Sequence, residues 1–294
     1  MMMQSRWEHF WFRPEPALNL RAAHIVLAAN ALWLALSRPD LPAIVTWPGP
    51  FWLHANPWLR ARFLIFPLGY TVEMALYIVL IAALVLVIVG RFVRPAALIS
   101  GLLLYHFAPL EDIFTSVGGP IFRGFTVPLL GLLIAGFACI PRRVEPASSE
   151  FRWPLALIQL LFAFTYLLSG VSKMCLVGLR WATAANFEGL VLGMVFPDVV
   201  PPWGRWFIGH PVLCWLGAIT GMVMDFGFVA AVFSRRAARV IVPLTFVAHV
   251  LIAGAMNVVF LGTPLLLLFV NWDWVAGRGR MRSGARSESG AAVR

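Results

Sequence analysis

The chain has 294 residues, of which 61% are hydrophobic and 12% charged, and its mean hydropathy is +0.84. These values are too apolar for a soluble globular protein of this length and are typical of a polytopic membrane protein. They exclude a large soluble catalytic domain, because no polar segment of this sequence is long enough to form one. We therefore predict an all-α, polytopic membrane helical bundle in which helices and short loops carry the function.

The first predicted element is an amino-terminal arm, residues 1–21, whose sequence MMMQSRWEHFWFRPEP mixes Arg, Glu, His and Trp. It has no small-residue cleavage site after its first apolar run, so it does not resemble a cleaved signal peptide. We expect this arm to lie in the membrane interface and to lead into a transmembrane domain over residues 22–275. Residues 276–294 are basic, and we expect them to form a disordered cytoplasmic tail.

Seven apolar runs within this domain have lengths suited to membrane spans, and an eighth is short. The seventh and eighth together are too long for one span and too short for two full ones, and Asn257, Gly262 and Pro264 are places where they can break. The sequence therefore predicts seven to eight spans. The eight runs are Ala22–Ser37, Thr71–Gly90, Ala96–Leu110, Phe122–Ile140, Trp153–Lys173, Pro211–Phe233, Val240–Val258 and Leu261–Val270.

The distribution of basic residues predicts the orientation of these spans. With a cytoplasmic amino terminus and a final run that crosses the membrane, 16 Lys and Arg residues fall on the inner side and seven on the outer side. Excess positive charge on the cytoplasmic side is the usual pattern of inner-membrane proteins, so we predict a multi-pass protein of a bacterial inner membrane. The net charge of +10 then reflects topology, and nucleic acid is not an expected partner.

Lys173 is the only lysine among the 23 basic residues, and it lies at the end of an apolar run. A lysine ammonium can lose its proton when it is desolvated, whereas arginine stays charged, so Lys173 is the first candidate for chemistry. The simpler interpretation is codon bias toward arginine together with a lysine that extends to the lipid headgroups. Both interpretations remain open from the sequence.

Polar residues recur every seven positions along the fifth run, and a seven-residue spacing keeps them on one face of a helix. Gln159 and Tyr166 on this face are explained by ordinary hydrogen bonds between membrane helices. The functional interpretation is a polar seam that leads inward from Lys173, with these residues binding substrate. The full stripe is Arg152, Gln159, Tyr166, Lys173 and Arg180.

Asp225 and His249 are ionisable residues in the middle of two successive apolar runs, which makes them candidates for a proton relay or a ligand site. Each lies twelve residues from Ala237, in the short turn between the runs, so their depths in the membrane should match. We predict a hydrogen bond between them. Straight helices would place both about 15 Å deeper than Lys173, without direct contact.

Three further outer residues complete the polar candidates. His106 in LYHFAPLED is followed by Glu111 and Asp112, and all three are candidates for substrate binding. His106 alone is equally explained as an interfacial histidine. The three cysteines have no spacing typical of metal ligands, so no metal is predicted, and a Cys175–Cys214 disulfide remains possible.

Several of these residues lie in the run IQLLFAFTYLLSGVSKM, which is followed by Trp181 and by the segments GHPVLCWLGAITGMVMDFGFVAAVF and VAHVLIAG. The order is Y-x-x-(A/S)-G-x-x-K-(L/M), then an acid within a helix, then a histidine on the next helix. This pattern resembles the HTTM (horizontally transferred transmembrane) family, which shares the membrane domain of vitamin K-dependent γ-glutamyl carboxylase. The similarity is densest over Phe151–Phe269, and GGPIF at Gly118–Phe122 extends it weakly.

The resemblance implies specific roles for the candidate residues. Lys173 matches the base that deprotonates vitamin K hydroquinone in the carboxylase, and Asp225 and His249 match the acid and histidine that follow. Ser172 stands where the carboxylase has a second lysine. The resemblance implies a quinol-dependent oxygenase or carboxylase-like lyase, with a reduced, vitamin K-like quinone as cofactor and a lipophilic small molecule or peptide as substrate. It also places Trp181 in the expected substrate site.

Two other functions fit the same residues. The protein could be a non-catalytic subunit that binds membrane lipids, assists export or joins a protein partner. Lys173 would then pair with Glu111, Asp112 or Glu188 across the outer loops. A proton-coupled transporter that uses Asp225 and His249 is the third possibility, although no inverted repeat is detectable in the sequence.

Overall fold

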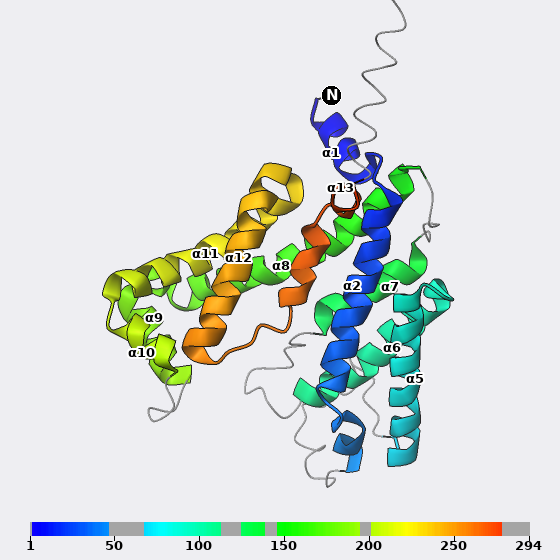
Figure 1. Cartoon of the computed structure of the whole chain (residues 1–294), viewed down its shortest axis with the longest axis horizontal. Coiled ribbons are helices and arrows are strands. Elements are labelled where there is room, and N and C mark those ends of the chain that lie inside the picture. Colours follow the sequence, from blue (N-terminus) through cyan, green and yellow to red (C-terminus); the bar gives the residue numbers. More distant parts are fainter. Residues whose placement is uncertain (1, 47–67, 113–124, 139–145, 195–200, 278–294) are drawn as a thin grey trace, which may run out of the picture. The chain divides into compact units, whose positions relative to one another are not determined.

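The computed structural model describes residues 2–46, 68–112, 125–138, 146–194 and 201–277 (Figure 1). The elements in these ranges are all helical, apart from one isolated antiparallel bridge between Glu15 and Ser148. Five helices are long and apolar enough to cross a membrane: α2 (Ala17–Leu36), α5 (Tyr70–Val89), α8 (Arg152–Leu176), α11 (Pro211–Phe233) and α12 (Arg235–Met256). The predicted class, an all-α protein with several helices long and apolar enough to span a membrane, is confirmed for the described residues.

Two further apolar helices, α6 (Val93–Asp112) and α7 (Thr126–Phe137), coincide with predicted runs. The eighth run forms the 3₁₀-helix η5 (Thr263–Phe269), whose seven residues extend only about 14 Å at about 2 Å per residue, less than half of a hydrocarbon core. The other elements are α1 (Met2–Phe12), η1 (Leu41–Thr46), η2 (Ser149–Phe151), η3 (Gly178–Ala182), α9 (Ala184–Met194), α10 (Pro202–Ile208) and α13 (Trp272–Val275).

The chain divides into two compact units, and each is described separately. Unit 1 consists of Met1–Ile158 and Val270–Arg294, and unit 2 consists of Gln159–Phe269. In unit 1, α2 packs against α5 and α7, and α6 packs against α5 and α7. Leucine and alanine fill this core, and Gly131 of α7 lets the Leu27 side chain of α2 approach to within 3 Å of where a Cβ would stand.

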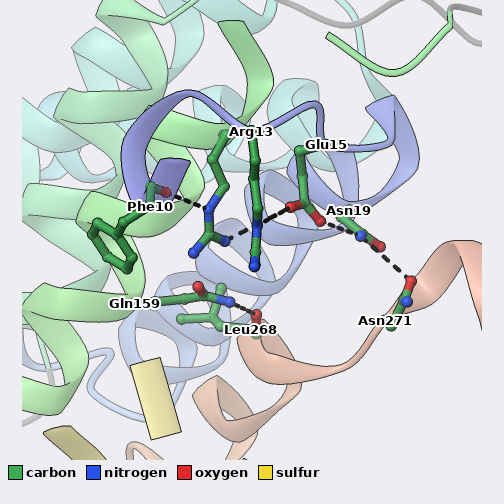
Figure 2. Close-up of polar contacts among 8 residues, drawn as sticks. Phe10, Arg13, Glu15, Asn19, Gln159, Leu268 and Asn271 are labelled. Atoms are coloured by element: carbon green, nitrogen blue, oxygen red, sulfur yellow. Dashed lines mark hydrogen bonds and ion pairs between the residues drawn. The ribbon is translucent and has the colours of Figure 1, made fainter. Parts of the chain in front are cut away.

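A buried carboxylate ties the amino-terminal arm to other parts of unit 1 (Figure 2). Glu15 is 3% exposed and lies 3.7 Å from both Arg13 Nε and Arg152 Nη1. It also accepts a hydrogen bond of 2.7 Å from Asn19 Nδ2, and Asn19 contacts Asn271 at 3.4 Å. Helix α2 begins at Ala17, so residues 17–21 of the predicted arm are helical and continuous with the first apolar run.

Unit 2 is built on the antiparallel pair α11 and α12, which meet at a single connecting residue, Ser234. The Ser234 hydroxyl accepts a hydrogen bond of 3.3 Å from Ala237 N and so caps α12. The helix ends at Met256 because Asn257 takes the left-handed conformation, with φ 54°. The predicted break at Asn257 is therefore confirmed.

The short helices α9 and α10 cover one end of this pair within unit 2. Their core includes Phe187 and Val191 of α9, which pack with Cys214, Ala218 and Ala255. Cys214 is buried, and its thiol donates to the carbonyl of Phe207 at 3.1 Å, whereas Cys175 is exposed at the end of α8. Both thiols are free, so the disulfide considered from the sequence is not formed.

Candidate functional site

The polar seam of α8 lies in unit 2, where each of its three central side chains bonds to a different element. Gln159 Nε2 donates to the carbonyl of Leu268 at 2.8 Å (Figure 2), Tyr166 pairs with His249 Nε2 at 3.2 Å, and Lys173 Nζ donates to Asp225 Oδ2 at 2.6 Å. On other faces of α8, Phe164 and Leu168 are exposed. The seven-residue spacing therefore placed these side chains correctly on one inward face.

The Lys173–Asp225 ion pair corrects the expected separation of about 15 Å between these residues. The expectation took straight helices that run parallel to each other. The two helices instead approach closely at Gly170, where an added Cβ would lie 2.9 Å from Asp225 Cβ and 3.1 Å from the Phe226 ring. Lys173, less than one turn further along α8, then reaches Asp225 directly. In the described part of the chain, the partner of Lys173 is therefore Asp225.

The pair lies between the protein interior and the exterior. The Asp225 side chain is 6% exposed and the Lys173 side chain 23% exposed, so the acid is buried and the lysine side chain is only partly covered. Trp181 in η3 covers the ammonium, with the ring centroid 5.0 Å from Nζ, a cation–π contact. An acid and an aromatic ring thus hold the only lysine of the chain.

The predicted hydrogen bond between Asp225 and His249 is wrong. Equal depth on neighbouring helices does not determine which way a side chain points. In the described part of the chain, Asp225 bonds to Lys173, whereas His249 bonds to Tyr166 and to Thr263 Oγ1, the latter at 2.9 Å. The seam thus has two polar centres, the Lys173–Asp225 pair and a chain through Tyr166, His249 and Thr263.

The hydrogen-bond donors and acceptors around His249 determine its tautomer. The Thr263 hydroxyl has one hydrogen, which it donates to the carbonyl of Phe260 at 2.7 Å. Its lone pairs must therefore accept from His249, so Nδ1 of the neutral ring carries the proton and Nε2 does not. Nε2 then accepts from the Tyr166 hydroxyl. The chain runs in one direction, from Tyr166 through His249 and Thr263 to a backbone carbonyl.

Aromatic rings pack around the hydrogen-bond chain of Tyr166, His249 and Thr263. Tyr166 stacks on Phe228 with ring centroids 4.4 Å apart, and Phe228 lies one helical turn from Asp225 on α11. On the other side, the His249 ring stacks on Phe260 at 4.2 Å. Phe162 closes the cluster against Tyr166 and Phe228. This surrounding is apolar, so the hydrogen bonds inside it are stronger than they would be in water.

His106 belongs to unit 1, where its Nε2 lies 2.9 Å from Glu73 Oε2. Glu73 is fully buried near the start of α5 and also accepts a hydrogen bond from the backbone N of Leu68 at 3.2 Å. Glu111 and Asp112 are the last two residues of α6, and their side chains lie outside the described residues. His106 therefore has a buried acidic partner on the neighbouring helix that the sequence did not indicate.

Three residues of the site were missed at the level of sequence. Gly170 could have been recognised, because a glycine one turn from a polar membrane residue permits close approach of helices. Thr263 lies beyond the end of α12 and Phe228 is one of 23 phenylalanines, so neither has a sequence signal of its own. Within the described ranges, no group of three or more His, Cys, Asp or Glu side chains is placed to hold a metal ion.

Five apolar helices of spanning length and a paired lysine and aspartate on two of them define an integral membrane protein with a polar site in its helical core. Comparisons with protein-family models, with curated proteins and with solved structures found no match to this chain. The function proposed below therefore rests on the residues of this site.

Proposed function

We propose that this protein is an HTTM-type membrane protein of a bacterial inner membrane that binds a lipophilic quinol at Lys173 and accepts a proton from it. The observation that carries the proposal is the Lys173–Asp225 pair, in which the Asp225 side chain is buried but the Lys173 side chain remains 23% exposed. A structural ion pair has no need of this access. The YLLSGVSKM pattern, with its resemblance to the carboxylase, supports the same role for Lys173.

The pair supplies a base without creating an isolated charge. Transfer of one proton from Lys173 Nζ to Asp225 Oδ2 converts the ammonium and carboxylate into a neutral amine and a neutral acid. The amine then takes a proton from a quinol hydroxyl, which leaves an ammonium beside a quinolate anion while Asp225 keeps its proton. Each stage has zero net charge, as an apolar surrounding requires.

The other seam residues position the quinol. Tyr166 donates its hydroxyl hydrogen to His249, so its lone pairs remain to accept a hydrogen bond from a second hydroxyl of the substrate. Trp181 presents an aromatic ring beside the ammonium, next to which a quinol ring can stack. Gln159 bonds to a backbone carbonyl and fixes η5 against α8. The bound quinol would serve oxygenase or carboxylase-like chemistry.

The proposal is tested by anaerobic titration of an isoprenoid naphthoquinol into nanodiscs that contain the protein, with quinolate absorbance as the readout. We expect quinolate to form with the wild type and most of the signal to be lost in Lys173→Arg, because arginine keeps its proton. Arg180→Met, which removes an exposed cation nearby, should leave the signal unchanged. Full quinolate formation in both Lys173→Arg and Lys173→Met would refute the proposal.

A second candidate function is a non-catalytic subunit that binds lipid, assists export or joins a protein partner. The observation that favours it is that Lys173 and Asp225 satisfy each other at 2.6 Å, as a structural pair would. In that case neither the wild type nor any variant forms quinolate. Lys173→Arg folds and functions normally, and only removal of the positive charge, as in Lys173→Met, destabilises the protein. The titration therefore separates the two functions.

The proposed orientation, with the amino terminus in the cytoplasm, places the end of α8 outside. Cys175, a free and exposed thiol near the end of α8, can show on which side of the membrane this end lies. We expect a membrane-impermeant maleimide to label Cys175 in intact spheroplasts, and we expect Cys175→Ser but not Cys214→Ser to abolish this labelling. Labelling of Cys175 only after permeabilisation would reverse the orientation.

A further inference from the structure

Unit 2 contains an apolar groove between α11 and α12 that the proposed chemistry does not use. Its volume is about 220 Å³. Small residues hollow both walls, among them Gly217 and Gly221 on α11 and Ala248 and Ala255 on α12. A Cβ added at Gly221 would meet nothing within 4 Å, so the space beside this glycine is open.

The lining chemistry selects hydrocarbon over water. Thr220 is the one lining residue, among those described, with a hydroxyl, amide or charged side chain. A buried water needs two to four polar partners, and this groove does not offer them. Phe187 and Phe207 close one end, and Gly217 lets the Phe187 ring come within 3 Å of where a Cβ would stand. The groove is therefore suited to an apolar chain.

The size of the groove and its position restrict the occupant further. A helix with its side chains is about 10–12 Å across, so a volume of about 220 Å³ matches a slender chain better than a whole helix. Leu216, Val247 and Leu251 line the groove and are exposed on two membrane-spanning helices. The groove therefore opens toward the lipid.

We propose that this groove binds one acyl chain of a membrane phospholipid. The chain enters sideways from the bilayer, lies along α11 and α12 and ends against the two phenylalanines. Met224 and Ala248, which line the groove, directly precede Asp225 and His249 in the sequence. The lipid thus contacts the two helices that carry Asp225 and His249, which are the partners of seam residues on α8.

The test uses phosphatidylethanolamine with a diazirine on one acyl chain, incorporated into nanodiscs with the full-length protein. After photolysis, we expect several-fold more lipid adducts on peptides of α11 and α12 than on α5, where Ile78 and Val79 are equally exposed but form no part of the groove. Gly221→Leu should remove most adducts from α11 and α12 and leave those on α5 unchanged, because the new side chain fills the open space.

Gly189→Leu is the matched control, since Gly189 also lies in a helix with open space around it but outside the groove, and we expect it to have no effect. Ala248→Leu fills the groove from the opposite wall and replaces Gly221→Leu if that variant does not fold. Adduct yields on α11 and α12 that equal those on α5, or that persist in the folded filled variant, would overturn the proposal. The readout involves neither quinol nor Lys173, so its outcome is independent of the proposed function.

Discussion

Lys173→Met should lower the free energy of unfolding by about 3 kcal/mol, since removing one partner of a buried ion pair leaves the other charge uncompensated. The effect falls at the lower end of the range for buried pairs because Lys173 keeps 23% exposure, whereas Asp225 keeps 6%. Denaturant or thermal unfolding in detergent micelles measures it. Lys173→Arg, which retains the positive charge, should lower the free energy of unfolding much less.

A double variant separates charge from packing. Lys173→Met with Asp225→Leu removes both charges, and we expect it to recover more than half of the loss, because apolar replacements of a buried pair are close to neutral. Arg180→Met, at an exposed position in η3, should change stability by no more than about 0.5 kcal/mol. If Lys173→Met lowered the free energy of unfolding no more than Arg180→Met does, the ion pair would not contribute to stability.

Glu15→Gln should destabilise unit 1 by a similar amount, about 3 kcal/mol, because it removes the negative charge between two arginines. Arg152 is 2% exposed, donates to the carbonyl of Phe10 at 3.0 Å and lies over the Phe10 ring, and the variant takes away the negative charge of Glu15 beside it. Glutamine is nearly isosteric and its amide oxygen still accepts from Asn19, but its NH2 group replaces the oxygen beside the two arginines, so the loss combines the missing charge with a donor that faces two donors.

Limited proteolysis of the amino-terminal arm, together with thermal unfolding, measures the effect of Glu15→Gln. We expect faster cleavage near α1, because the Glu15 carboxylate lies beside Arg152 of α8 and helps to hold the arm in place. Glu8→Gln is the matched control, since Glu8 is exposed on α1. Equal proteolysis and equal melting in the two variants would show that the buried carboxylate does not fasten the arm.

The sequence predicted the membrane class, the positions of most long helices and the face of α8 that carries the seam. These features depend on hydrophobic length and on helical periodicity, both of which are local. The break at Asn257 was predictable for the same reason, because asparagine favours the left-handed conformation that ends α12. The seven-residue spacing of Gln159, Tyr166 and Lys173 needs only the geometry of one helix.

The pairing of side chains was not predictable in the same way. Whether Lys173 meets Asp225 depends on the approach of α8 and α11 at Gly170, and whether Asp225 meets His249 depends on the rotation of α11 and α12 about their axes. Neither quantity follows from depth along a straight helix. Thr263, which determines the tautomer of His249, lies beyond the end of α12, where no periodicity applies.

The central claim is that Lys173 and Asp225 are in direct contact, and the single lysine makes it directly measurable. Protein with ¹⁵N at lysine Nζ and ¹³C at the aspartate carboxyl carbons contains one labelled amine and five labelled aspartates. Solid-state NMR in lipid bilayers should show a strong Nζ–carboxyl dipolar coupling that disappears in Asp225→Asn. A wild-type protein without this coupling, or a coupling that survives Asp225→Asn, would contradict the pair and the proton chemistry proposed for it.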